Sequence, residues 1–91
     1  MLNFTKRYII NVITKPEVAV HLIPNVKGFD IIYYIKEECK GAEPKDSEEK
    51  DMLKVKFLCS FDAFPKIWDY LDKYYVKDYG IVLYHQIVVT A

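Results

Sequence analysis

The chain has 91 residues, about half of them apolar, and its 13 basic and 13 acidic side chains give a formal net charge of zero. A nucleic-acid binder needs a basic stripe that releases phosphate counterions, and this charge balance argues against one. No run approaches the roughly 20 apolar residues of a membrane span, and residues 1–6 lack the apolar run of a signal peptide. The sequence therefore predicts one cytoplasmic domain, residues 1–91, that does not span a membrane.

The first elements in chain order are a strand and a short helix. Residues 7–13 are nearly all β-branched or aromatic, which is typical of a central strand buried on both faces. Thr14 can cap the helix that follows, and Pro16 is tolerated in its first turn. An apolar stripe then runs to Ile23, and Pro24 is expected to end the helix because proline lacks a backbone N–H.

Two strands are expected on either side of a charged segment. Residues 29–37 alternate, with Phe29, Ile31, Tyr33 and Ile35 on one side. Residues 53–60 alternate more clearly and form the third strand. Residues 40–51 between them are mostly charged and are expected to be mobile. That loop is either a solvated hairpin connection or a segment that becomes ordered when it binds a ligand or partner.

A second helix and a fourth strand complete the chain. Asp62 can cap the helix, Pro65 suits its first turn, and the helix is expected to end near Val76, before a turn at Gly80. Its apolar stripe consists of Phe64, Ile67, Trp68, Leu71 and Tyr75, with Trp68 as a core anchor. Residues 81–89 form the last strand and are largely apolar on both faces.

The order of these elements predicts the fold class. It is an α+β protein, a ferredoxin-like βαββαβ sandwich in which two helices cover one face of an antiparallel four-stranded sheet. Strands that are apolar on both faces leave one face that the helices cannot cover. We therefore expect identical subunits to bury that face against each other.

Few residues suggest catalysis or metal binding. The two histidines, His21 and His85, are far apart in sequence; we expect the first on a helix surface and the second hydrogen-bonded in the core or an interface. Cys39 and Cys59 are expected to stay reduced, the latter as a small buried hydrophobe. Because no glycine-rich phosphate loop or nucleophile constellation is present, we predict no catalytic residue, no metal ligand and no enzyme activity.

Three segments of the chain resemble the P-II signalling superfamily and its P-II-like relatives: residues 26–30, 53–57 and 74–84. The resemblance implies a homotrimer with inward-facing sheets. It also implies a mobile loop, here residues 40–51, which reports ligand state to a target protein such as a transporter or an enzyme. A small anionic ligand, typically an adenine nucleotide, would lie in clefts between the subunits.

By position, the resemblance also implies the residues of that ligand site. Gly28 and Asp30 would lie near a base, and the lysines would meet phosphate or another anion. The implied ligand-binding residues are Gly28, Asp30, Lys36, Lys40, Lys77 and Gly80. The implied function is that of a non-enzymatic regulatory or sensor protein.

Two alternatives to a P-II-like regulatory protein remain open from the residues alone. One is a metal-binding protein like the ion-tolerance relatives of this fold, which the two histidines, the two cysteines and the acidic loop would suggest. The other is an interaction module that binds no ligand.

Overall fold

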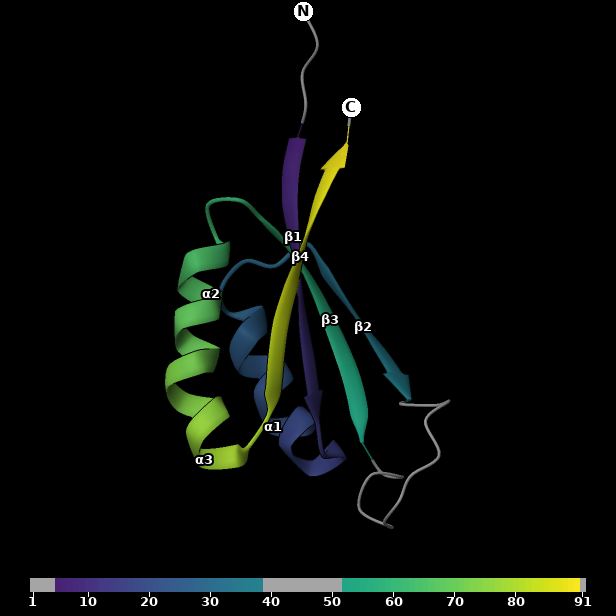
Figure 1. Ribbon diagram of the computed structural model, residues 1–91, viewed down its shortest axis with the longest axis vertical. Coiled ribbons are helices and arrows are strands. Elements are labelled where there is room, and N and C mark those ends of the chain that lie inside the picture. Colours follow the sequence, from purple (N-terminus) through teal and green to yellow (C-terminus); the bar gives the residue numbers. More distant parts are fainter. Residues whose placement is uncertain (1–4, 39–51, 91) are drawn as a thin grey trace, which may run out of the picture.

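The computed structural model describes residues 5–38 and 52–90, whose elements follow the order βαββαβ (Figure 1). The predicted loop at 40–51 lies outside the described residues. The elements are β1 Thr5–Thr14, α1 Pro16–Lys27, β2 Tyr33–Glu38, β3 Leu53–Ser60, α2 Phe64–Leu71, η2 Asp72–Val76, α3 Lys77–Tyr79 and β4 Val82–Thr90. Segments α2, η2 and α3 form one continuous helix, called the second helix below, in which η2 is a π-helical turn.

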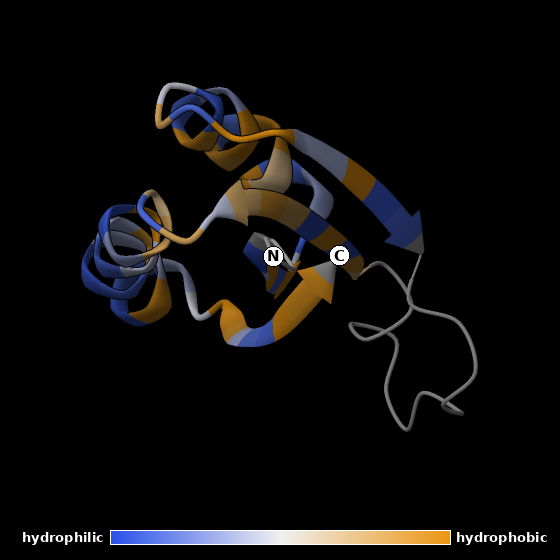
Figure 2. Ribbon diagram, turned by 90° about the horizontal axis from the view of Figure 1, so that it is seen from above, coloured by the Kyte–Doolittle hydropathy of each residue, from blue (hydrophilic) through white to orange (hydrophobic). Residues whose placement is uncertain are grey.

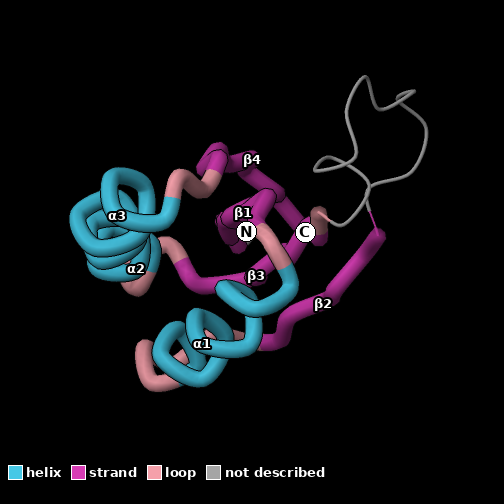
Figure 3. Tube along the Cα trace, turned by 90° about the horizontal axis from the view of Figure 1, so that it is seen from below, coloured by secondary structure: helices cyan, strands magenta, loops and turns pink. Residues whose placement is uncertain are grey.

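The four strands form one antiparallel sheet in the order β2-β3-β1-β4. Both helices lie on the same side of this sheet (Figure 3). This arrangement confirms the predicted ferredoxin-like sandwich, with β1 in the interior of the sheet and with β2 and β4 at its edges. Among the described residues, no helix has the length and apolar character needed to cross a membrane.

The core lies between the helices and the face of the sheet that they cover. Every second residue of β3 points into it, as the alternation predicts, and the two helices contribute their apolar stripes. Its buried residues are Ile10, Val12, Ala19, Leu22, Ile23, Val26, Val55, Phe57, Cys59, Ile67, Leu71, Tyr75 and Ile81. Trp68 is only half-buried and packs at the margin of this core.

The first helix is longer than predicted, because α1 continues through Pro24 to Lys27. Pro24 is exposed, while Leu22, Ile23 and Val26 are buried against the sheet. Burying those three side chains stabilises the helix by about 2 kcal/mol each. An interior proline costs about 3 kcal/mol. The helix does not stop at the proline, and Val26 beyond it is fully buried in the core.

Neither predicted N-terminal cap is formed. Thr14 is the last residue of β1, where it pairs with the first residue of β3, and Lys15 takes the N-cap position of α1 without a side-chain hydrogen bond. Ala63 rather than Asp62 is the N-cap residue of α2. The backbone N–H of Ala63 donates to Oγ of Ser60 at 3.1 Å, so a side chain from the end of β3 satisfies this amide.

The second strand begins at Tyr33, later than predicted, and its faces are shifted. Asp30 has a φ of 65°, a left-handed value that interrupts the extended chain before the strand. Phe29, Ile31 and Tyr34 pack against the core, whereas Tyr33 lies 52% exposed on the other face. The prediction that residues 29, 31, 33 and 35 share one face is therefore wrong beyond Ile31.

The second helix runs past its predicted end near Val76 to Tyr79. Gly80 ends it with a φ of 66°, a conformation that glycine adopts without steric cost. The last strand is Val82–Thr90 rather than residues 81–89. It is hydrophobic at both ends and hydrophilic in its middle (Figure 2).

Candidate functional site

One face of the sheet carries no described helix, and we call it the uncovered face. The strand register places on it Arg7, Ile9, Asn11 and Ile13 of β1, Tyr33, Ile35 and Glu37 of β2, Lys54, Lys56 and Leu58 of β3, and Val82, Tyr84, Gln86 and Val88 of β4. Among these, Tyr33, Ile35, Val82 and Tyr84 are between 36% and 52% exposed. They lie on the two edge strands, and the half-buried Ile9, Ile13 and Leu58 lie between them on the same face. Apolar surface of this extent is of the kind that proteins use for contacts.

The charged side chains near one end of the uncovered face interact with one another or with a ring. Nζ of Lys56 lies 3.6 Å from Oε1 of Glu37. Nζ of Lys54 lies 5.3 Å from the centre of the Tyr84 ring, which is a cation–π distance. Lys56 is thus paired with a carboxylate and Lys54 lies over an aromatic ring.

Asn11 is a buried polar residue in the middle of the uncovered face. Its Nδ2 donates to Oε1 of Gln86 at 3.3 Å, and its Oδ1 has no hydrogen-bond partner among the described residues. A buried acceptor without a donor costs about 1–3 kcal/mol. The face therefore combines exposed apolar residues with a polar centre whose hydrogen bonding is incomplete within one chain.

The residues that the resemblance implies for a ligand site lie at two ends of the sheet (Figure 1). Gly28 and Asp30 lie in the connection between α1 and β2. Lys77 and Gly80 lie in α3 and directly after it, at the opposite end. Lys36 is exposed on the edge strand β2.

Within one chain these residues do not form a single site. The edge strands β2 and β4 are three strand spacings apart, about 14 Å. The first residues of β2 and β4 are also displaced along the strand direction. Tyr33 of β2 pairs with Leu58 of β3, whereas Val82 of β4 lies in the row of Lys54 of β3. Four residues of β3 separate these two rows, which is about 13 Å. Lys40 lies outside the described residues. The implied site thus needs at least two copies of the chain, and it stays a prediction.

The residues singled out for their chemistry are mostly structural. Cys59 is fully buried, with its Sγ 3.7 Å from the carbonyl oxygen of Tyr8, and burial raises the pKa of its thiol to about 11. The prediction of a buried hydrophobe at this position is confirmed. Within residues 5–38 and 52–90, no three His, Cys, Asp or Glu side chains gather where they could hold a metal ion.

His85 is exposed within one chain, so it is not a residue of the core. Its expected place in an interface stays a prediction. Its ring lies edge-on to the rings of Phe64 and Trp68, with centres 5.0 and 4.9 Å apart. These contacts place His85 on the helix side of the sheet, so the uncovered face does not include it.

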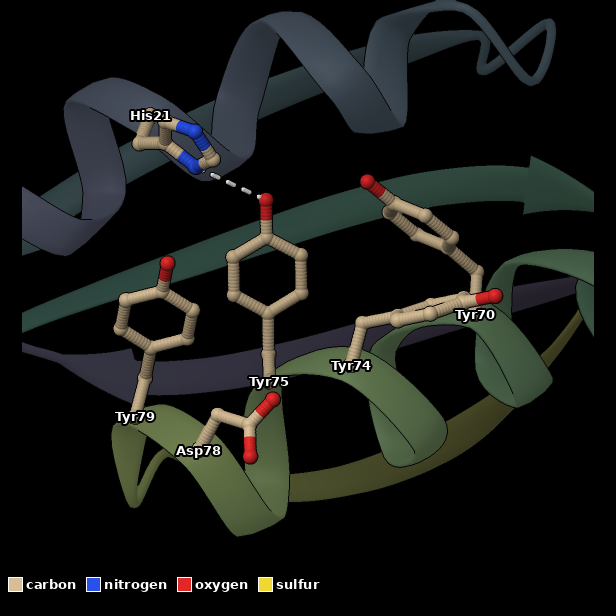
Figure 4. Close-up of a pocket in the computed structure, with 6 residues that line it drawn as sticks. All are labelled: His21, Tyr70, Tyr74, Tyr75, Asp78 and Tyr79. Atoms are coloured by element: carbon tan, nitrogen blue, oxygen red, sulfur yellow. Dashed lines mark hydrogen bonds between the residues drawn. The ribbon is translucent and has the colours of Figure 1, made fainter.

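A pocket of about 320 Å³ lies between α1 and the second helix (Figure 4). It is lined by His21, Tyr70, Tyr74, Tyr75, Asp78 and Tyr79. His21 comes from α1, where it is exposed as predicted, and its Nδ1 lies 3.0 Å from the hydroxyl oxygen of Tyr75. Nδ2 of Asn25 donates to the same oxygen at 2.9 Å. We call this space the tyrosine pocket.

The tyrosine pocket is not among the sites that the sequence patterns predict. Tyr75 is buried in the core as its place in the apolar stripe predicts, but its hydroxyl reaches the pocket at the edge of the core. In an α-helix of 3.6 residues per turn, Tyr70 and Tyr79 would lie about half a turn out of phase. The one sequence feature that could indicate the pocket is the density of tyrosine, since four of the eight tyrosines in the chain fall within residues 70–79.

Comparisons with known proteins identify the fold. No family model matches the sequence, and neither does any curated protein. The crystal structure of a PII-like signaling protein from Thermus thermophilus matches with a TM-score of 0.78 and 14% identity, over 99% of this chain and 94% of that one.

CPII, a nitrogen regulatory PII-like protein from Thiomonas intermedia, is also similar. Its apo form matches with a TM-score of 0.77 and 4% identity, over 97% of this chain and 95% of that one. Its form bound to ADP, AMP and bicarbonate matches with a TM-score of 0.75 and 5% identity, over 98% of this chain and 97% of that one. The chain therefore has the fold of PII-like signalling proteins over nearly its whole length, which confirms the predicted resemblance at the level of the fold.

Proposed function

We propose that this chain is a non-enzymatic, cytoplasmic regulatory protein of the PII-like kind. It assembles as a homotrimer, binds a small anionic ligand in clefts between its copies, and signals through residues 40–51 to a target transporter or enzyme. The observation that carries the proposal is the fold, which is shared almost end to end with signalling proteins, one of them solved with ADP, AMP and bicarbonate bound. Ligand contacts would favour one conformation of the signalling segment over others.

The uncovered face supports the assembly. Its most exposed apolar side chains lie on the two edge strands, and a monomer would leave them in water. Both edge strands, β2 and β4, also present apolar side chains, which without a partner invite non-specific pairing. Contact between identical copies would bury both features at once, as closed symmetric oligomers do.

Two exposed lysines support an anionic ligand. Lys36 lies on β2, close to the signalling segment, and Lys77 lies one turn before β4 begins. The ligands named for CPII, which are ADP, AMP, bicarbonate and acetate, are all anions. Because the two lysines lie near opposite edges of one sheet, we place each ligand between neighbouring copies, where β2 of one and α3 of another can meet.

Isothermal titration calorimetry with ADP, AMP and bicarbonate tests this proposal. We expect at least one of them to bind, and we expect Lys36→Glu or Lys77→Glu to weaken that binding about tenfold or more. Lys66→Glu is the matched control, since Lys66 is exposed on α2 outside the implied site. No binding at millimolar concentration, or equal loss in the control, would overturn the ligand site. Binding of a divalent metal ion but of no anion would favour the metal-binding alternative.

A further inference from the structure

The π-helical turn η2 gathers four tyrosines on one side of the second helix. In a regular α-helix each residue rotates by about 100°, and tyrosines five or nine positions apart diverge widely. A π-helical turn holds more residues, so each residue rotates less and positions five apart become neighbours. The ring centres of Tyr70 and Tyr75, five positions apart, accordingly lie 5.7 Å from each other. Those of Tyr70 and Tyr74 are 5.3 Å apart, and those of Tyr75 and Tyr79 are 5.2 Å apart.

Single π-helical turns inside α-helices are rare, and they occur frequently at functional sites. The turn carries Tyr75, whose ring is buried in the core, and it also brings the four tyrosine rings to one side of the helix. Its visible effect is the tyrosine pocket. The geometry therefore points to the pocket as a built feature of the surface.

The chemistry of the pocket lining is that of a cation site. Asp78 is the one charged residue among the six that line it, and no lysine or arginine is among them. The Tyr75 hydroxyl is held by Asn25 and His21, and Tyr74 and Tyr79 are each about half exposed. Aromatic faces next to a carboxylate attract ammonium groups, and methylated ammonium ions are recognised by aromatic cages of this kind.

One tyrosine of the pocket already contacts an ammonium group, and the lining disfavours anions and flat bases. Nζ of Lys73 lies 5.5 Å from the centre of the Tyr74 ring, so this ring accepts an ammonium group in its present position. An anion would meet Asp78 without a compensating cation in the lining. A flat base cannot enter between Tyr75 and Tyr79, because their stacked rings are 5.2 Å apart and a third ring would need about 7 Å.

We propose that the tyrosine pocket binds a small methylated ammonium ion, held by the tyrosine rings that line the pocket and by the carboxylate of Asp78. At about 320 Å³ the pocket has the size for a small molecule of this class. The pocket lies wholly within one chain, on the helix side of the sheet. All of its lining residues come from a single chain, so this inference can be tested without the anion site.

Choline is the probe, and 3,3-dimethylbutan-1-ol, which has the same shape without the charge, is the matched control ligand. Titration followed by NMR shifts of the tyrosine ring protons should show choline binding with a dissociation constant on the order of 1 mM. The neutral alcohol should bind about tenfold more weakly. Equal binding of the two ligands, or no saturable shift with choline, would overturn the proposal.

Variants of the lining residues distinguish choline binding in the pocket from weak binding elsewhere on the protein. Tyr79→Leu and Asp78→Asn should each weaken choline binding about tenfold, whereas Tyr79→Phe keeps the ring and should retain it. Tyr33→Leu removes an equally exposed tyrosine from the uncovered face and should leave binding unchanged. Because both lining residues are exposed, a circular dichroism melt can verify that the variants fold. Loss of binding in Tyr33→Leu, or full retention in Asp78→Asn and Tyr79→Leu, would contradict the assignment.

Discussion

The hydroxyl oxygen of Tyr75 lies 3.0 Å from Nδ1 of His21, and this contact joins the π-helical turn η2 to α1. Nδ2 of Asn25 donates to the same oxygen at 2.9 Å. Two residues of α1, one helical turn apart, are thus fixed to one side chain of the second helix. This contact closes the inner wall of the tyrosine pocket.

Removing the Tyr75 hydroxyl should destabilise the fold modestly. Tyr75→Phe keeps the buried ring but loses both hydrogen bonds, while His21 and Asn25 are exposed and can bond to water instead. The free energy of unfolding should therefore fall by about 1 kcal/mol, measured by urea denaturation. Tyr74→Phe is the control and should change it by less than about 0.5 kcal/mol. Equal losses in the two variants would show that the hydrogen bonds contribute nothing.

Replacing the proline inside α1 should stabilise the protein. Pro24→Ala restores the backbone N–H that the helix lacks at an exposed position, so the free energy of unfolding should rise by about 1–3 kcal/mol. Pro65→Ala, in the first turn of α2 where proline is tolerated, should change it by less than about 0.5 kcal/mol. A Pro24→Ala variant that melts below the parent protein would contradict this account of α1.

Some elements of the fold are predictable from the sequence and others are not. The strand Leu53–Ser60 is predicted to the residue, because alternation over eight positions leaves only one register that buries its apolar side. Pro24 is misleading because tertiary burial of its neighbours overrides a local preference. Asp30 is misleading because nothing local shows that a non-glycine residue takes a left-handed conformation, and this one residue changes which face Tyr33 occupies.

The candidate sites are less predictable than the fold. The uncovered face follows from strands that are apolar on both sides, and the sequence predicts it. The tyrosine pocket depends on a π-helical turn, and a helical wheel drawn at α-helical spacing scatters Tyr70 and Tyr79 to opposite sides. The proposed anion site would lie between copies, and the sequence patterns of one chain carry no signal for such contacts.

The buried thiol of Cys59 should make stability depend on pH in the alkaline range. Burial raises its pKa from 9.0 to about 11, so the folded protein holds this proton more tightly than the unfolded chain does. The resulting stabilisation is complete below pH 9 and is lost as the pH rises through 11. Cys59→Ala lacks this contribution, and its deficit in unfolding free energy relative to the parent should shrink between pH 9 and 11. A constant deficit across that range would contradict the assignment.

Sedimentation equilibrium of the purified chain at micromolar concentration tests the central claim most directly. We predict a mass three times the 10.8 kDa of one chain, because copies bury the uncovered face against each other. Ile35→Lys places a charge on that face and should reduce the mass to one chain, whereas Val20→Lys, at an exposed position of α1, should leave the assembly intact. A parent protein that sediments as a folded monomer would contradict the account.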